Sequence, residues 1–225
     1  MTIGIIPAAG KATRIHGLPK YLLPVPGGYL LERMAHRMGV PCVIGANPDN
    51  YDLINACKPP NSTVYSVNSR GMPETILAAR EYAGDENVLV GMPDTYWTDE
   101  TVFWYLTKFL NRGAVCVAAI FHVSAEMASR LGVCIFRFES SLFLNDIEDK
   151  QPQTEARWVW GALAWSPEFW QYIYPEDAHL GVALQRALRQ GLEIPLWGAD
   201  GDYYDNGTSE DYFRCIRELT TEVVA

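Results

Sequence analysis

Ile3-Gly-Ile-Ile-Pro-Ala-Ala-Gly-Lys-Ala-Thr-Arg14, closed by Pro19-Lys20, is the stretch around which we expect the chain to fold. It begins as an apolar, β-favouring run, which is typical of a fully buried strand. It then breaks into small residues and places Lys11, Arg14 and Lys20 within ten positions. Small residues allow a turn to approach a ligand closely, and consecutive backbone N–H groups in such a turn attract anions. The stretch therefore predicts a strand followed by a turn that suits a triphosphate.

Two familiar phosphate-binding patterns do not fit these residues. The P-loop requires Gly-Lys-Ser/Thr after a second glycine, and the dinucleotide fingerprint requires several spaced glycines. Neither pattern follows Gly10. A plain strand and turn with surface lysines is the simpler alternative, and this stretch alone leaves it open.

The segments after this turn alternate between helical and strand patterns. Apolar residues recur at helical spacing from Leu30 to Met38, and a second helix is predicted from Glu74 to Ala83. Short apolar runs at 42–45, 63–67 and 87–91 indicate buried strands between them. Because these runs do not alternate in polarity, they predict a mostly parallel sheet covered by helices on both faces. Ligands bind beyond the carboxyl ends of such strands, so the first turn and Asp94 should share that edge.

The second half of the chain has a different texture. A helix over 99–112 and a long apolar strand over 114–123 precede short strands and polar turns between Ser124 and Arg157. We expect a small antiparallel lobe folded over one side of the sheet, with about 124–165 contributing to substrate binding. A last strand should end at Asp205, before a C-terminal helix that begins with a capping box formed by Thr208 and Asp211. The 225 residues suit one domain, 1–225.

Composition excludes several classes of protein. The formal net charge of −9 argues against nucleic-acid binding, which requires a basic footprint. No tract approaches the roughly 20 apolar residues that span a bilayer, and no signal peptide is recognisable, so we expect no membrane partner. Five cysteines without Cys-x-x-Cys spacing favour reduced thiols in a cytoplasmic protein. The sequence leaves the oligomeric state open, and a homo-oligomer is possible.

Several motifs, taken together in chain order, resemble one enzyme family. Ala8-Ala-Gly10-x-Ala-Thr-Arg14, then Pro19-Lys20 and Leu22-Leu-Pro-Val25, are similar to the N-terminal signature of sugar-1-phosphate nucleotidylyltransferases. The resemblance implies a Rossmann-like α/β fold of the nucleotide-diphospho-sugar transferase type, with a mixed, mostly parallel sheet and a small antiparallel sugar-binding lobe. It also implies the reaction: a sugar-1-phosphate attacks the α-phosphorus of a nucleoside triphosphate, and pyrophosphate leaves.

The resemblance assigns roles to the cationic turn. Arg14 would hold the leaving phosphates, because its planar fork binds two oxygens at once, and Lys20 would follow the α-phosphate as a compact charge. The nucleophile is already ionised, so positioning and charge stabilisation would provide the catalysis without a general base. The remaining nucleotide-binding residues implied by the family pattern are Ala8, Ala9, Gly10, Lys11, Thr13, Asn68 and Gly71.

Two aspartates match the metal ligands of the family. Asp94 ends Val88-Leu-Val-Gly-Met-Pro-Asp94, and Asp205 lies in Tyr203-Tyr-Asp-Asn-Gly-Thr208. Mg²⁺ favours one or two carboxylates together with substrate phosphate oxygens, so Mg²⁺ is the expected cofactor. A helix or turn cap at Asp94 and a turn residue at Asp205 remain as structural alternatives.

The acceptor side is implied by three further matches. Leu131-Gly132-Val133 resembles the Tyr-Gly-Val of the family, and Asp149-Lys150-Gln-Pro152 resembles its Glu-Lys-Pro. Gly161 corresponds to a glycine on a strand that lines the sugar pocket. The resemblance thus implies sugar-phosphate binding by Gly132, Asp149, Lys150 and Gly161, although a hairpin turn would explain each motif by itself.

Two other functions stay open. Only four residues separate Arg14 from Pro19, which resembles cytidylyltransferases and favours a non-sugar phosphate or phosphonate as the acceptor. A regulatory module that binds nucleotide without catalysis is the second alternative, and retention of both cations and both aspartates argues against it. The sequence does not identify the base or the sugar.

Overall fold

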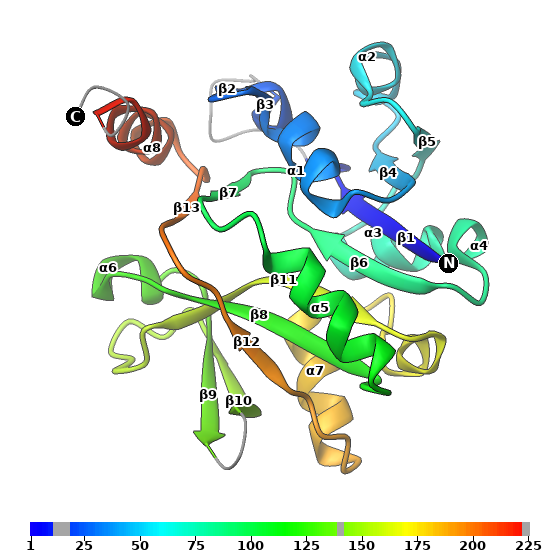
Figure 1. The fold of residues 1–225 in the computed structure, drawn as a ribbon. Coiled ribbons are helices and arrows are strands. Elements are labelled where there is room, and N and C mark those ends of the chain that lie inside the picture. The colour runs from blue at the N-terminus through cyan, green and yellow to red at the C-terminus, as the bar shows by residue number, and fades with distance from the viewer. Residues whose placement is uncertain (11–18, 139–141, 222–225) are drawn as a thin grey trace.

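The computed structural model describes residues 1–10, 19–138 and 142–221, and these fold around one large mixed sheet. Within these ranges the sheet has nine strands in the order β10-β9-β11-β6-β1-β4-β5, with β8 paired to β11 and β12 paired to β8. Figure 1 shows the arrangement. The strands are β1 (Thr2–Pro7), β4 (Cys42–Ala46), β5 (Ser62–Ser66), β6 (Asn87–Gly91), β8 (Cys116–His122), β9 (Gly132–Phe138), β10 (Leu142–Asp149), β11 (Trp158–Trp165) and β12 (Leu196–Gly198).

The N-terminal half of the sheet is parallel, as the sequence predicts. β1 lies between β4 and β6, and β5 pairs with β4, all in parallel register. Ile5 and Ile6 are consecutive and both fully buried, because helices cover both faces of this half. The mixed α/β fold expected from the sequence is therefore confirmed, and the first strand ends where the cationic turn begins.

The C-terminal half of the sheet is antiparallel, except that β12 runs parallel to β8, and it depends on β11. This strand pairs with β6 through residues 162–165, with β8 along its whole length, and with β9 at Val159. Its first half therefore extends beyond the carboxyl end of β6 and offers backbone groups to the β9–β10 hairpin there. The antiparallel lobe expected over 124–165 thus continues the main sheet at its edge and does not fold over one side of it.

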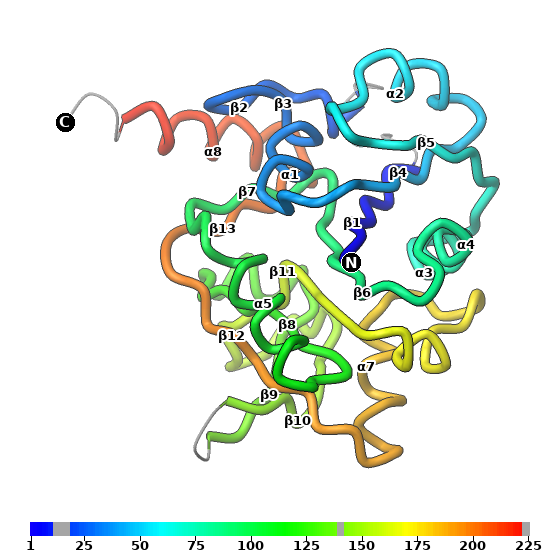
Figure 2. The backbone as a smooth tube through the Cα atoms, turned by 45° about the vertical axis from the view of Figure 1, so that its right-hand side comes forward, coloured from blue at the N-terminus to red at the C-terminus, as the bar shows by residue number. Residues whose placement is uncertain are grey.

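Helices cover the two faces of the sheet. One face carries α1 (Leu30–Met38), α2 (Tyr51–Cys57), α5 (Val102–Asn111) and α6 (Ala125–Ala128), whose buried side chains share one apolar cluster. The other face carries α3 (Met72–Ala78), α4 (Arg80–Ala83), the 3₁₀ helix η2 (Pro167–Tyr172) and α7 (Leu180–Arg189) in a second cluster. Figure 2 shows the N-terminal strands above and β8 to β12 below.

Two helix predictions need correction at their ends. The helix expected at Glu74–Ala83 begins two residues earlier, because Pro73 occupies the first turn, where its missing N–H has no partner to lose. It is also interrupted at Ala79, which separates α3 from α4. The helix expected at 99–112 is shorter, since α5 spans only Val102–Asn111. These shifts leave the faces of the sheet unchanged.

The C-terminal helix packs beside a short hairpin that residues 24–29 form early in the chain. α8 (Ser209–Thr221) and the hairpin formed by β2 (Pro24–Val25) and β3 (Gly28–Tyr29) lie together in Figures 1 and 2. The Tyr212 hydroxyl donates to the Pro24 carbonyl at 2.7 Å, and Cys215 belongs to the third apolar cluster, together with Val25. The expected cap is confirmed in part, because the Asp211 N–H donates to Thr208 Oγ1 at 3.2 Å, while the Asp211 carboxylate accepts from the Thr208 hydroxyl at 2.7 Å. The 3₁₀ helix η1 (Lys20–Leu22) precedes the hairpin.

A second small sheet joins two distant loops. β13 (Tyr203–Asp205) pairs with β7 (Thr95–Trp97), and Asp205 lies opposite Thr95. The sequence predicts β13 but gives no sign of β7. This pairing places Asp205 next to the loop that carries Asp94.

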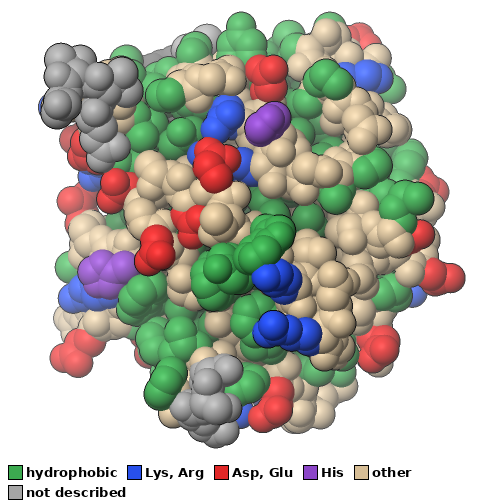
Figure 3. All heavy atoms as spheres, viewed as in Figure 1, with side chains coloured by type: hydrophobic (Ala, Val, Ile, Leu, Met, Phe, Trp, Pro, Cys, Tyr) green, Lys and Arg blue, Asp and Glu red, His purple; other side chains and the backbone are tan. Residues whose placement is uncertain are grey.

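The outer surface of α5 is partly apolar. Figure 3 shows hydrophobic side chains gathered over this helix. Trp104 is 55% exposed, and the Lys108 amino group lies 3.3 Å from the centre of its ring. The attraction between the ammonium group and the face of the ring stabilises this exposed pair of side chains. Among the described residues, no helix is long and apolar enough to cross a membrane.

Gly161 provides a test of packing in the centre of the sheet. A Cβ at this position would lie 2.6 Å from the Phe121 ring and 2.7 Å from the Tyr203 ring, and neither ring has space to move. We therefore expect Gly161→Ala to lower the free energy of unfolding by about 1–3 kcal/mol in urea denaturation. Gly198→Ala is the matched control, because its nearest contact is 3.9 Å away. Equal stability of the two variants would contradict this packing role.

Candidate active site

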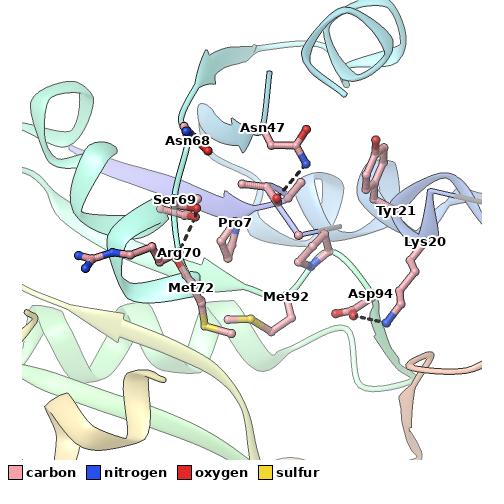
Figure 4. Close-up of a pocket in the computed structure, with 16 residues that line it drawn as sticks. Pro7, Lys20, Tyr21, Asn47, Asn68, Ser69, Arg70, Met72, Met92 and Asp94 are labelled. Atoms are coloured by element: carbon pink, nitrogen blue, oxygen red, sulfur yellow. Dashed lines mark hydrogen bonds and ion pairs between the residues drawn. The ribbon is translucent and has the colours of Figure 1, made fainter. Parts of the chain in front are cut away.

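A cleft of about 610 Å³ opens at the carboxyl ends of the parallel strands, as Figure 4 shows. Its walls come from the ends of four strands. Pro7–Gly10 follows β1, Asn47 follows β4, 68–72 connects β5 to α3, and 92–94 follows β6. The volume is that of an ordinary small-molecule pocket. Of the residues expected to bind nucleotide or metal, the lining includes Ala8, Ala9, Gly10, Lys20, Asn68, Gly71 and Asp94.

Two asparagines hold the turn after β1 in place. Asn47 Nδ2 donates to the Ala9 carbonyl at 2.9 Å, and Asn50 Nδ2 donates to the Ala8 carbonyl at 3.1 Å. The Asn50 N–H in turn donates to Asn47 Oδ1 at 3.0 Å. With these carbonyls occupied, the backbone of the turn is fixed relative to β4. Sequence reasoning missed this role, although Asn47-Pro-Asp-Asn50 after a strand is a turn signal.

Lys20 and Asp94 lie at one end of the cleft, and the loop that carries Asp205 lies beside them. Lys20 Nζ lies 3.3 Å from Asp94 Oδ2, and the lysine side chain is only 13% exposed. The Asn206 N–H and Nδ2 donate to the Asp94 carbonyl at 3.0 and 3.1 Å, which ties the two aspartate loops together. The structure therefore joins groups that are 74 and 111 positions apart in the chain.

The electrostatics of this cluster favour a cation. Burial and, after it, the nearby negative charge of Asp94 raise the pKa of Asp205 to about 6, whereas Lys20 acts in the opposite direction. Two carboxylates so placed can share a divalent cation together with oxygens of a phosphate ligand. Among the described residues, no group of three or more His, Cys, Asp or Glu is placed to hold a metal. The donor set fits Mg²⁺, which accepts few protein ligands.

Three expected nucleotide-binding and catalytic residues lie outside the described residues. They are Lys11, Thr13 and Arg14, between Gly10 and Pro19.

The residues expected on the acceptor side meet at the open end of the β9–β10 hairpin. Gly132 pairs with Asp149 across the two strands. A Cβ on Gly132 would lie 2.9 Å from Trp160 Nε1 and 3.6 Å from Asp149 Oδ1, so the glycine leaves room for both groups. The Lys150 N–H donates to the Leu131 carbonyl at 3.1 Å, and the Lys150 side chain is exposed. Gly132, Asp149 and Lys150 are therefore neighbours.

Gly161 is placed differently from these three residues. The space on its side-chain side is filled by Phe121 and Tyr203 in the apolar core. Successive residues of a strand face opposite sides of the sheet, so Trp160 does not share the surroundings of Gly161. The pairing of β11 with β8 also shifts register between Trp160 and Ala162. Gly161 is therefore a packing glycine, and its neighbour Trp160 is the residue that approaches Gly132.

Comparison with known proteins agrees with this geometry. The model of one protein family, described as the MobA-like NTP transferase domain, matches residues 4–167, which is more than half of the chain. No curated protein matches the sequence.

Solved structures share the fold at low sequence identity. A protein described as a glucose-1-phosphate thymidylyltransferase from Bacillus anthracis, in complex with sucrose, superposes with a TM-score of 0.83 at 16% identity, covering 97% of this chain and 95% of that one. A UDP-glucose pyrophosphorylase complexed with UDP-glucose has a TM-score of 0.79 at 18% identity, with 99% of both chains covered. A UTP-bound UGPase from Acinetobacter baumannii has a TM-score of 0.79 at 16% identity, with 99% of this chain and 94% of that one covered.

The two aspartates predict a distinctive pH dependence of stability. Because the pKa of Asp205 is raised from an ordinary 3.8 to about 6, the contribution of this group to stability is full below pH 4 and is lost as the pH rises to about 6. Asp94→Asn removes a neighbouring negative charge and should lower the pKa of Asp205. We therefore expect this variant to lose less stability than the parent protein between pH 4.5 and 6.5.

Urea denaturation across this pH range measures the difference. Asp52→Asn, which changes an exposed carboxyl on α2, is the matched control and should follow the parent protein. Parallel curves for Asp94→Asn and the parent would show that the two aspartates do not interact.

Proposed function

This chain belongs to the family of MobA-like NTP transferase domains and is a nucleotidyltransferase, and we propose that its acceptor is a sugar-1-phosphate. The reaction would transfer a nucleotidyl group from a nucleoside triphosphate to the sugar phosphate, release pyrophosphate and give an NDP-sugar. The observation that supports this proposal is the cluster of Lys20, Asp94 and Asp205 at the edge of the cleft.

The chemistry of the reaction matches this cluster. Both reactants are polyanions, so their approach requires cancellation of charge, and the acceptor phosphate is already ionised and needs no general base. Lys20, held by Asp94, supplies a compact positive charge at the edge of the cleft where the α-phosphate would lie. Arg14 would hold the leaving phosphates with its planar fork.

The cofactor follows from the same groups. Asp94 and Asp205 would hold Mg²⁺, which when bound would supply further positive charge against the triphosphate. The backbone of Ala8 to Gly10, fixed by Asn47 and Asn50, would face the phosphates, with Lys11 and Thr13 beside it. Asn68 and Gly71, at the far end of the cleft from Asp205, would contact the base.

The acceptor would enter from the β9–β10 side. β11 extends past the carboxyl end of β6, so the hairpin residues Gly132 and Asp149 lie beyond the sheet edge that carries Asp94. Lys150 is exposed next to Asp149 and would meet the acceptor phosphate.

One sequence feature favours a second candidate. The four-residue gap between Arg14 and Pro19 resembles that of cytidylyltransferases, which would make a non-sugar phosphate or phosphonate the acceptor. Both candidates use the same nucleotide cleft and differ only in the acceptor.

Substrate identity is tested by pyrophosphate release. We expect release in the presence of Mg²⁺, one nucleoside triphosphate and one sugar-1-phosphate, each drawn from a panel of common compounds. Release with phosphocholine or a phosphonate, and with no sugar phosphate, would favour the second candidate. Nucleotide binding without release in either panel would contradict a catalytic role.

Lys20 and Asp205 are tested by substitution. Lys20→Met should lower kcat by about 100- to 1,000-fold, because a buried charge at the reacting phosphate is lost. Asp205→Asn should remove most of the activity, and the activity that remains should no longer depend on the Mg²⁺ concentration. Lys58→Met, on the exposed surface, is the matched control and should keep full activity. Retention of a normal kcat by Lys20→Met would remove this residue from the site.

A further inference from the structure

A buried carboxylate joins two segments that lie 81 positions apart in the chain. Asp211, in the first turn of α8, has a side chain that is only 7% exposed. Arg130, between α6 and β9, donates to both of its oxygens, through Nη1 at 3.3 Å and Nη2 at 3.1 Å. A two-point contact of this kind fixes the direction of the guanidinium as well as its distance, so it holds the two segments in one orientation.

The same carboxylate is bound to the loop before α8. The Thr208 hydroxyl donates to Asp211 Oδ2 at 2.7 Å, and this oxygen also accepts from Arg130 Nη1. The Asp211 N–H donates back to Thr208 Oγ1 at 3.2 Å. The position of Thr208 therefore depends on the pair that Arg130 forms with Asp211.

Gly207 connects this contact to Asp205. A Cβ on Gly207 would lie 3.2 Å from Asp205 Oδ2 and 3.5 Å from Oδ1, so the carboxylate rests against the backbone of the glycine. Gly207 precedes Thr208 directly, so a movement of Thr208 would also move the surface on which the carboxylate lies. A short path of contacts thus links the guanidinium of Arg130 to the carboxylate of Asp205.

The backbone of Arg130 is fixed to the edge of the large sheet. Its N–H donates to the Met127 carbonyl at 3.1 Å, which continues the last turn of α6. Leu131 follows, and its carbonyl accepts from the Lys150 N–H at 3.1 Å, next to the pairing of β9 with β10. The guanidinium of Arg130 therefore sets the position of the Asp205 loop relative to this sheet.

A second arginine allows positioning to be separated from compensation of charge. Arg214 Nη2 donates to Asp211 Oδ1 at 3.1 Å, the same oxygen that accepts from Arg130 Nη2. Both arginines thus compensate the buried negative charge. Arg214 lies three residues after Asp211 in α8, so its contact stays within one helix. If Arg130 acted only by compensating this charge, the two arginines would be equivalent.

We propose that Arg130 is a positioning residue for Asp205 and acts through Asp211 and the turn 207–208. The inference rests on the proposed function, because it takes Asp205 as a ligand for Mg²⁺. It assigns to the reaction a residue that does not line the cleft. Arg130 acts by keeping the carboxylate of Asp205 in one place and contacts neither substrate.

The direction of the effect on metal binding separates positioning from a direct effect of charge. Burial is the main influence that raises the pKa of Asp205, and the positive charge of Arg130 is one of the influences that lower it. A positive charge close to the site repels a divalent cation, so its loss alone would strengthen metal binding. Loss of a positioning residue would weaken metal binding, because contacts behind the ligands orient them.

The first experiment measures binding of Mn²⁺ to the full chain without substrates, by electron paramagnetic resonance. Mn²⁺ is the probe because it accepts the same oxygen ligands as Mg²⁺. Arg130→Met should raise the dissociation constant about tenfold, as is typical when a residue behind the metal ligands is lost. Arg130→Lys keeps the charge but loses the planar fork, so it should restore only part of the affinity. Arg214→Met is the matched control and should bind Mn²⁺ as the parent protein does.

The second experiment compares steady-state kinetics with stability in the same variants. Arg130→Met should lower kcat about tenfold with KM for the triphosphate unchanged, because the cleft lining is intact. Arg214→Met should keep the parent kcat. In urea denaturation the two variants should lose similar stability, since each removes one cation from the same buried carboxylate. A difference in kcat between them therefore reports positioning.

The outcomes separate the inference from the proposed function. Equal Mn²⁺ affinity and equal kcat in Arg130→Met and Arg214→Met overturn the inference alone, as does tighter Mn²⁺ binding by Arg130→Met. If Asp205→Asn binds Mn²⁺ as the parent does, the metal site of the proposed function falls and the inference falls with it. Absence of pyrophosphate release with every acceptor overturns the proposed function, whereas Mn²⁺ binding that is weaker in Arg130→Met than in Arg214→Met still supports the inference.

Discussion

The site depends on holding the loops of two partly buried aspartates together. Burial and, after it, the negative charge of Asp94 both raise the pKa of Asp205, so the carboxylate form of Asp205 is disfavoured at this place. The backbone pairing of β7 with β13 and the two hydrogen bonds from Asn206 to the Asp94 carbonyl keep the loops together, while Lys20 neutralises part of the charge. A site that holds negative charge against repulsion attracts cations, which is the property required where two phosphates must meet.

A single sheet positions both cavities. The cleft proposed for the nucleotide lies at the ends of the parallel strands, and a second cavity lies at the end of β10. β11 connects them, because it pairs with β6 at one end and with β9 at the other. The separation of the two sites is therefore set by backbone hydrogen bonds. This rigidity suits a reaction in which positioning supplies much of the rate.

The two cavities differ in chemistry as well as in place. The cleft combines methionine side chains, backbone groups and Lys20, which suits a base at one end and phosphates at the other. The second cavity has carboxylates and amides, and the pair of His179 and Asp149 forms part of its wall.

The sequence by itself determined the parallel half of the sheet, the turn after β1, the position of Asp94 at the sheet edge and the pairing of Thr208 with Asp211 at the start of α8. Each of these leaves a local signal, because apolar runs, small residues and capping pairs reflect the burial and backbone conformation of neighbouring residues. Only the tertiary structure decided that β7 pairs with β13, that Trp160 rather than Gly161 approaches Gly132, and that His179 reaches Asp149. A three-residue strand is too short to show a pattern, and contacts between distant residues depend on packing that neighbouring residues do not record.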